Sequence, residues 1–242
     1  MFDVIGFDAD DTLWHTEVLY TNVQARFRQL LAPYGDPDQV DRQLYLTETG
    51  NLTYYGYGIK SFALSLIETT AQLSRDCIPV QLVTEIISLA KTMLTAEVLV
   101  MEHAQGALAR LAAAYPLMLI TKGELSEQEP KIARSGLSPH FRYLEIMADK
   151  TPDRYAALLE RHRLQPARFL MVGNSLRSDI LPVLELGGYA VHIPYHLTWE
   201  HEVAELPGGD HCRYFKLEHL GQLPALIEQL DQGDQPPLFL RY

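Results

Sequence analysis

Three aspartates directly behind a short apolar run near the N-terminus constrain the fold more than any other feature of this chain. The apolar run, residues 4–7, has no helical period and predicts a strand buried on both faces. Because an unpaired buried charge is very costly, Asp8 and Asp10 must lie at the carboxyl end of that strand. Alternate residues of an extended segment share a face, so these two carboxylates are expected to point the same way. They suit a divalent cation, or a nucleophile beside a general acid/base, and the alternative interpretation is a solvated acidic turn.

The rest of the chain alternates between strands and helices. Further strands are expected at residues 117–121, which form a buried apolar run, and at 143–147, 169–172 and 189–194, with helical patterns between them. Such alternation predicts an α/β fold with a doubly wound, Rossmann-like parallel sheet. Residues 15–95 show helical spacing throughout and predict an inserted all-helical cap domain. We therefore expect a catalytic core of residues 1–14 and 96–242 and a cap of residues 15–95.

Polar residues follow the later strands at the same edge of the predicted sheet. Thr121, Lys122 and Gly123 combine a hydroxyl with free backbone N–H groups, which suits a phosphate oxygen, although a capping threonine explains them equally well. Lys150 follows the third strand and could neutralise nearby carboxylates or hold a phosphoryl anion, although an isolated lysine is usually solvated. The fourth strand is followed by the segment Gly173-Asn174-Ser175-Leu176-Arg177-Ser178-Asp179.

Taken in chain order, these segments resemble the four motifs of the haloacid dehalogenase-like (HAD) superfamily of hydrolases, in its phosphatase branch with a helical cap after the first motif. The first motif is the Asp-x-Asp-x-Thr spacing from Asp8, the second is Thr121, and the third is the Lys-x-Pro-Asp spacing from Lys150. In the fourth, Gly173 and Asp179 match, but asparagine stands where the family usually has an aspartate. An amide oxygen can still coordinate Mg²⁺, but it contributes no charge.

The resemblance implies a set of roles for these residues. Asp8 would attack phosphorus to form an aspartyl-phosphate, and Asp10 would serve as general acid and then general base. Lys150 and Thr121 would hold the phosphoryl oxygens. The implied ligands of Mg²⁺ are Asp8, the backbone carbonyl of Asp10, Asn174 and Asp179, the last binding directly or through water, or else orienting Lys150.

The predicted function is a Mg²⁺-dependent phosphatase acting on a small phosphorylated metabolite. The presence of Asp10 favours a phosphatase over a dehalogenase, because HAD dehalogenases lack the second aspartate. A phosphomutase keeps both aspartates and stays open, and a phosphonatase would need a cap lysine such as Lys60 or Lys91, for which surface positions are expected. Asn174 alone favours a different class, a binding or regulatory module with weak catalysis.

Substrate contacts from the cap are expected in residues 51–60, where three tyrosines and two glycines gather. We interpret this segment as a substrate-facing loop and select Tyr54 and Tyr57, beside Thr121, Lys122 and Gly123, as substrate-binding residues. The alternative is that the tyrosines pack the core of the cap itself.

The overall composition and charge limit the classes of binding partner that we expect. A hydrophobic content of 47% in 242 residues allows a sizeable core. The formal charge of -11, from 31 acidic and 20 basic residues, disfavours nucleic acids as partners. Cys77 and Cys212 have no metal-ligand spacing and are expected to be free thiols. With no apolar stretch of membrane-spanning length, we expect a cytoplasmic protein, monomeric or homodimeric, without a membrane partner.

Overall fold

The computed structural model describes residues 2–75, 77–207 and 212–232. Within these ranges six strands form one sheet in the order β3-β2-β1-β4-β5-β6, and every neighbouring pair is parallel. The predicted doubly wound, Rossmann-like α/β fold is therefore confirmed. The sixth strand was not predicted. The strands are β1 (Val4–Phe7), β2 (Leu117–Lys122), β3 (Tyr143–Met147), β4 (Phe169–Gly173), β5 (Tyr189–His192) and β6 (Tyr214–Lys216).

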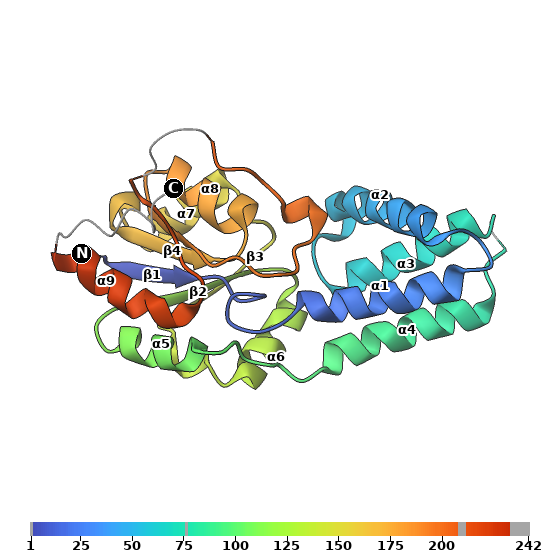
Figure 1. Cartoon of the computed structure of the whole chain (residues 1–242), viewed down its shortest axis with the longest axis horizontal. Coiled ribbons are helices and arrows are strands. Elements are labelled where there is room, and N and C mark those ends of the chain that lie inside the picture. Colours follow the sequence, from blue (N-terminus) through green and yellow to red (C-terminus); the bar gives the residue numbers. More distant parts are fainter. Residues whose placement is uncertain (1, 76, 208–211, 233–242) are drawn as a thin grey trace.

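Helices cover both faces of the sheet (Figure 1). Ile5 and Phe7 of β1 pack in one apolar layer with α5 (Ala104–Ala112), α6 (Leu125–Ser135) and α9 (Leu223–Gln232). Val4 faces the opposite layer, with α7 (Pro152–Arg161) and α8 (Leu181–Glu185). This alternation follows from the two-residue period of a strand, and it requires apolar residues on both faces of β1. The carboxylates that follow β1 are thereby directed to its end.

The other helices lie between β1 and β2 in the chain and form a bundle beside the sheet, at the right of Figure 1. We call this bundle the helical insertion. It consists of α1 (Glu17–Leu31), α2 (Pro37–Tyr55), α3 (Ile59–Leu73) and α4 (Val80–Thr95). It has an apolar cluster of its own, which includes Phe27, Leu66 and Ile86 and is separate from both layers of the sheet. This packing agrees with the predicted cap, but a division into domains at residues 14/15 and 95/96 stays a prediction, and its core segment extends beyond the described residues.

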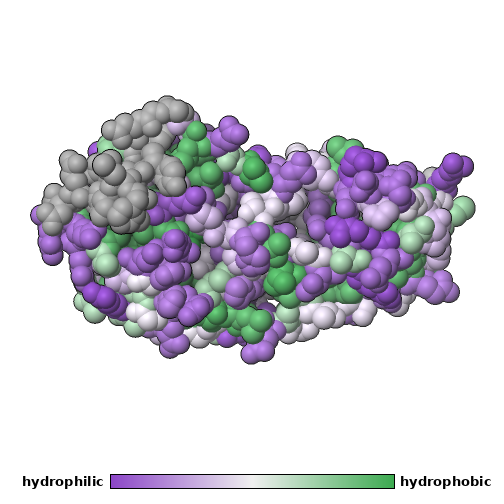
Figure 2. Space-filling view, in the orientation of Figure 1, coloured by the Kyte–Doolittle hydropathy of each residue, from purple (hydrophilic) through white to green (hydrophobic). Residues whose placement is uncertain are grey.

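Short helical turns complete the described chain: η1 (Ser138–His140), η2 (Pro166–Arg168), the π-helical turn η3 (Leu176–Ile180), η4 (Glu200–Glu202) and η5 (Leu220–Gln222). On the face shown in Figure 2, hydrophobic residues appear as small separate groups among hydrophilic ones. Cys77 and Cys212 are exposed free thiols, as predicted. None of the described helices has the length and apolar character needed to cross a membrane.

Candidate active site

A cavity of about 180 Å³ lies at the carboxyl edge of the sheet, between the strand ends and the helical insertion. The order of the strands reverses beside β1, between β1 and β4, and ligands of open parallel sheets bind at such a switch point. The cavity brings together eight of the ten residues predicted for the site: Asp8, Asp10, Thr121, Lys122, Lys150, Asn174, Asp179 and Tyr57.

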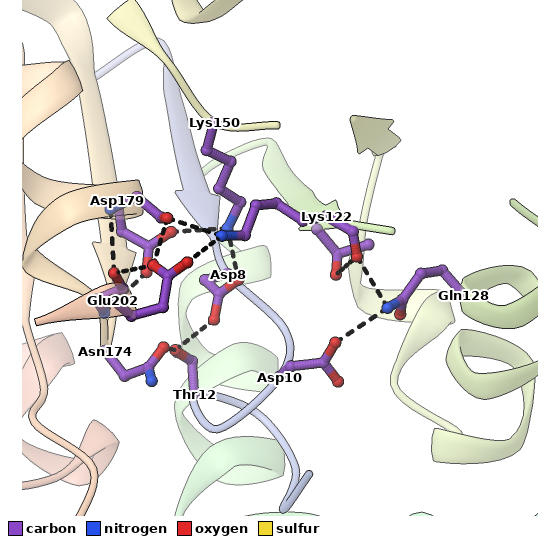
Figure 3. Close-up of polar contacts among 12 residues, drawn as sticks. Asp8, Asp10, Thr12, Lys122, Gln128, Lys150, Asn174, Asp179 and Glu202 are labelled. Atoms are coloured by element: carbon purple, nitrogen blue, oxygen red, sulfur yellow. Dashed lines mark hydrogen bonds and ion pairs between the residues drawn. The ribbon is translucent and has the colours of Figure 1, made fainter. Parts of the chain in front are cut away.

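Lys150 is the buried centre of the site (Figure 3). Its Nζ donates to Asp8 Oδ1 at 2.5 Å and to Asp179 Oδ1 at 2.7 Å. The position follows from local structure, because Thr151 caps α7 and the lysine directly precedes that cap at the end of the loop from β3. Burial alone would lower the pKa of Lys150, but the two carboxylates raise it well above its usual value. Lys150 is therefore a fixed cation beside the predicted nucleophile.

Asp179 holds this lysine in place. Its second oxygen, Oδ2, accepts the backbone N–H of Ser175 at 3.0 Å, so both carboxylate oxygens are in use. Gly173 makes the close approach possible, since a Cβ at that position would lie 2.3 Å from Asp179 Oδ2. Of the two roles that the sequence left open for Asp179, its contacts match the orientation of Lys150.

Asp8 is buried and has its second oxygen free of lysine. Thr12 Oγ1 lies 2.8 Å from Asp8 Oδ2 and 3.2 Å from Asn174 Oδ1, so these two oxygens lie close together. Burial and the neighbouring Asp179 raise the pKa of Asp8 to about 7, against the opposing effect of Lys150. A cation or a phosphoryl group with bound cation would favour the ionised form.

Asp10 faces a different part of the cavity. Its Oδ1 accepts from Trp14 Nε1 at 2.7 Å, from Thr16 Oγ1 at 2.7 Å and from Lys131 Nζ at 2.8 Å, and its Oδ2 accepts from Gln128 Nε2 at 3.0 Å. Burial would raise the pKa of Asp10, but Lys131 and the two other donors to Oδ1 lower it to about 2. The expectation that Asp8 and Asp10 point the same way is wrong, because β1 ends at Phe7 and the alternation of the strand does not extend to Asp10 (Figure 3).

A family model of haloacid dehalogenase-like hydrolases matches residues 2–187. The chain belongs to this family. The solved structure of a haloacid dehalogenase-like family hydrolase from Xanthomonas campestris is 36% identical to it, with a TM-score of 0.85 over 96% of this chain and 93% of that one. No curated protein matches the chain.

Two more distant solved structures share the fold of this HAD-like hydrolase. One is a 2-haloacid dehalogenase from Pseudomonas syringae pv. Tomato DC3000, 19% identical, with a TM-score of 0.60 over 95% of this chain and 100% of that one. The other is a predicted phosphoglycolate phosphatase from Haemophilus somnus 129pt, 15% identical, with a TM-score of 0.59 over 93% of this chain and 98% of that one. Their names indicate different chemistries, so likeness of fold does not decide between the two.

Lys122 of the HAD-like hydrolase contacts the segment after β5, which sequence patterns did not indicate as part of the site. Its Nζ donates to Glu202 Oε1 at 2.5 Å and to Ser178 Oγ at 2.9 Å, and it lies 4.1 Å from the ring centroid of Tyr57. Burial would raise the pKa of Glu202, but Lys122 and two serine hydroxyls lower it to about 2. Tyr57 also packs edge-on against Trp199, which lines the cavity. The segment after β5 thus joins the strand ends to the helical insertion.

Two predicted substrate residues do not line the cavity. Tyr54 is 80% exposed, because α2 continues through Tyr55 and the predicted loop shrinks to residues 56–58. The prediction for Tyr54 is corrected accordingly. Gly123 has a φ of 124° and lies beside Gln128, whose Nε2 would be 3.2 Å from an added Cβ. Its role is to let the backbone pass this side chain.

Two carboxylates of the helical insertion also line the cavity, and sequence reasoning missed both. Burial raises the pKa of Glu17 to about 8, together with surrounding carboxylates, and burial raises that of Glu48 to about 8. Asp11 accepts the backbone N–H of Thr16 at 2.8 Å and of Glu17 at 3.0 Å. It therefore caps the start of α1.

Proposed function

We propose that this hydrolase is a Mg²⁺-dependent phosphatase that acts on a small phosphorylated metabolite through an aspartyl-phosphate on Asp8. The observation that carries the proposal is the contact between Asp8 and the buried Lys150, with a second aspartate on the same loop. A carboxylate attacks an anionic phosphoryl group only if positive charge neutralises that group. Lys150 supplies one fixed positive charge at that point.

The residues divide the reaction as follows. An oxygen of Asp8 bonds to phosphorus while the bond from phosphorus to the leaving oxygen breaks, and Thr121 with Lys150 holds the phosphoryl oxygens. Asp10 then accepts a proton from the water that cleaves the aspartyl-phosphate, a role that suits its ionised state. For the earlier proton transfer to the leaving oxygen, the bond from Lys131 to Asp10 must first loosen, because that bond keeps the carboxylate ionised.

The donor set fits a hard cation. Asp8 Oδ2 and Asn174 Oδ1 converge on one hydroxyl, and the backbone carbonyl of Asp10 follows on the same loop, so these oxygens would hold Mg²⁺. When bound, the ion would neutralise phosphoryl charge. The described residues contain no group of three His, Cys, Asp or Glu side chains around one point. Since Asn174 is neutral, we expect the affinity of the site for Mg²⁺ to be modest.

The helical insertion acts in this proposal as a lid that keeps bulk water out during transfer. It contacts the core through α6: Glu127 Oε2 accepts the backbone N–H of Ile59 at 2.9 Å, and Lys60 forms an ion pair with Glu124. Lys60 and Lys91 do not line the cavity, so neither is placed to form the Schiff base of a phosphonatase.

A haloacid dehalogenase is the second candidate. Two observations favour it: a neutral Asn174, and an Asp10 whose carboxylate is taken up by four donors. In that case Asp8 would attack carbon, halide would leave, and no cation would be required.

One set of assays separates the candidates. The purified protein is given para-nitrophenyl phosphate with Mg²⁺ and with a chelator, and chloropropionate with the release of halide measured. If the proposal holds, the ester is hydrolysed only with Mg²⁺. After an acid quench during turnover, the peptide that contains Asp8 should be heavier by the mass of one phosphoryl group. Release of halide without ester hydrolysis would reject the proposal in favour of the second candidate.

A further inference from the structure

The cavity has two walls that differ in how their charged groups are paired. The wall at the strand ends combines carboxylates with Lys150 and Lys122. The wall formed by the helical insertion presents the carboxylates of Glu17 on α1 and Glu48 on α2. Both glutamates also border an adjoining hollow on the outer side of the cavity. A substrate that places its phosphoryl group at Asp8 would therefore direct its other end to these two carboxylates.

Neither glutamate has a cationic partner in the described part of the chain. Three cations of the helical insertion pair with other carboxylates: Arg26 with Glu85, Arg28 with Asp41, and Lys60 with Glu124. Arg28 borders the adjoining hollow, but its Nε donates to both oxygens of Asp41, at 2.7 and 2.9 Å. A partly buried carboxylate without a partner is costly, so its retention in a ligand cavity calls for a ligand that supplies the charge.

A second, independent observation points the same way. Gln128 lines the cavity and is only 3% exposed, and its Oε1 has no hydrogen-bond partner among the described residues. The amide cannot be turned round, because its Nε2 donates both to Asp10 and to the backbone carbonyl of Lys122. The wall of the cavity therefore contains a buried acceptor that lacks a donor, in addition to the two carboxylates.

Aromatic rings complete the same side of the cavity. Tyr20 and Phe62 lie with their ring centroids 5.0 Å apart, and Trp199, from the segment after β5, lines the same cavity. Carboxylates combined with aromatic faces attract cations, since the face of an aromatic ring is electronegative.

We propose that the substrate is a phosphate monoester whose alcohol part carries an ammonium group, and that Glu17 and Glu48 receive this group. The inference rests on the proposed phosphatase function and names its substrate class. An ammonium has three donors and no acceptor, which matches a wall rich in acceptors, whereas a hydroxyl brings one donor and no charge. Burial raises the pKa of both glutamates to about 8, and a bound ammonium would favour their ionised forms.

The test compares matched substrates. Values of kcat/KM are measured with Mg²⁺ for aminoethyl, aminopropyl and aminobutyl phosphate, each against the hydroxyalkyl phosphate of the same length. We expect the best amine to be preferred by at least about tenfold, the value of one hydrogen bond to a charged group. Glu48→Gln and Glu17→Gln should each lower this amine-to-alcohol ratio, and the double variant should bring it close to one. Glu85→Gln, which removes the same charge from the exposed surface of α4, should leave the ratio unchanged.

The outcomes are distinct. A wild-type ratio near or below one, with para-nitrophenyl phosphate still hydrolysed, would overturn the ammonium inference and leave the phosphatase proposal standing. A ratio that survives in the double variant would overturn the assignment to these glutamates. No hydrolysis of any ester would overturn both proposals. Because the wild-type ratio needs no variant, a substitution that prevents folding does not weaken the test.

Discussion

The two walls of the cavity differ in whether their carboxylates have a cationic partner. Three carboxylates of the core wall each have a lysine: Asp8 has Lys150, Asp10 has Lys131, and Glu202 has Lys122. Those of the insertion wall, Glu17 and Glu48, have none within the described chain. The consequence is a pKa of about 2 for Asp10 and Glu202, against about 8 for Glu17 and Glu48. Asp10 and Glu202 are thus neutralised within the protein, whereas Glu17 and Glu48 are not.

Asp8 stands between these two extremes. It has a lysine, but it shares that lysine with Asp179 inside a buried site, and its pKa is raised to about 7 by burial and by the second carboxylate. A nucleophile with incomplete neutralisation retains affinity for further positive charge. The comparison therefore predicts where a metal ion, a phosphoryl group and an ammonium group would each bind.

The largest expected effect comes from removal of the nucleophile. Asp8→Asn should lower kcat for para-nitrophenyl phosphate by at least about a thousandfold, because an amide does not form the acyl-phosphate bond. Volume hardly changes, so circular dichroism and the thermal unfolding curve should stay close to those of the wild type. Substantial remaining turnover in a folded variant would remove Asp8 from the mechanism.

The next effect is on stability, and it tests the pairing in the core wall. Lys150→Met leaves Asp8 and Asp179 buried without their shared cation, which should cost about 3–5 kcal/mol in the free energy of unfolding. Lys60→Met breaks an exposed pair and should cost roughly 0–1 kcal/mol. Chemical denaturation of both variants measures the difference. Equal losses would mean that Lys150 contributes no special stabilisation.

The sheet was predictable because β1, β2 and β4 contain uninterrupted apolar runs, and buried parallel strands require such runs. β6 was not predicted, because it spans only Tyr214–Lys216 and is too short to give a periodic signal. The residues at the strand ends were predictable for a related reason: carboxylates and a lysine that directly follow a strand cannot be buried within it and must lie at its end. Their directions were not predictable, as the divergence of Asp8 and Asp10 shows.

Residues that reach the cavity from helices and from the segment after β5 were missed. Gln128, which lines the cavity, and Lys131, which donates to Asp10, are three positions apart on α6, and the sequence does not distinguish them from a solvated helix face. Glu202 lies in a segment without periodicity, and its partners are remote in sequence. Glu17 and Glu48 look like ordinary surface residues until α1 and α2 are placed against the sheet. Such contacts depend on tertiary packing, which local patterns do not encode.

A smaller effect is expected where a carboxylate is added to the core wall without a lysine. Asn174→Asp would place a second charge beside Asp8, since Thr12 Oγ1 lies within 3.2 Å of both side chains. The variant should bind Mg²⁺ several-fold more tightly, because ligand charge tunes the affinity for hard cations. Without the ion it should unfold at a lower temperature than the wild type, owing to repulsion. Calorimetric titration with Mg²⁺ measures the affinity, and an unchanged value would mean that residue 174 does not face the metal.

The smallest effect concerns the insertion wall and depends on pH. A carboxyl whose pKa is about 8 in the folded state and 4.5 in the unfolded state binds more protons when folded between these values. Its contribution to stability is therefore complete below pH 4.5 and is lost as the pH rises through 8. Glutamine does not titrate, so Glu48→Gln should match the wild type in Tm at pH 5 and exceed it by about 2–4 °C at pH 9.

An ammonium ligand should reverse this difference, and that reversal links the stability of the insertion wall to its proposed use. At pH 8 an aminoalkyl phosphate gives the ionised Glu48 a partner, so it should raise the Tm of the wild type more than that of Glu48→Gln. The matching hydroxyalkyl phosphate should raise both by similar amounts. Glu85→Gln, whose exposed side chain pairs with Arg26, should follow the wild type with either ligand. A glutamate that lowers stability when the cavity is empty, and recovers it only with a cationic ligand, would be kept for binding rather than for the fold.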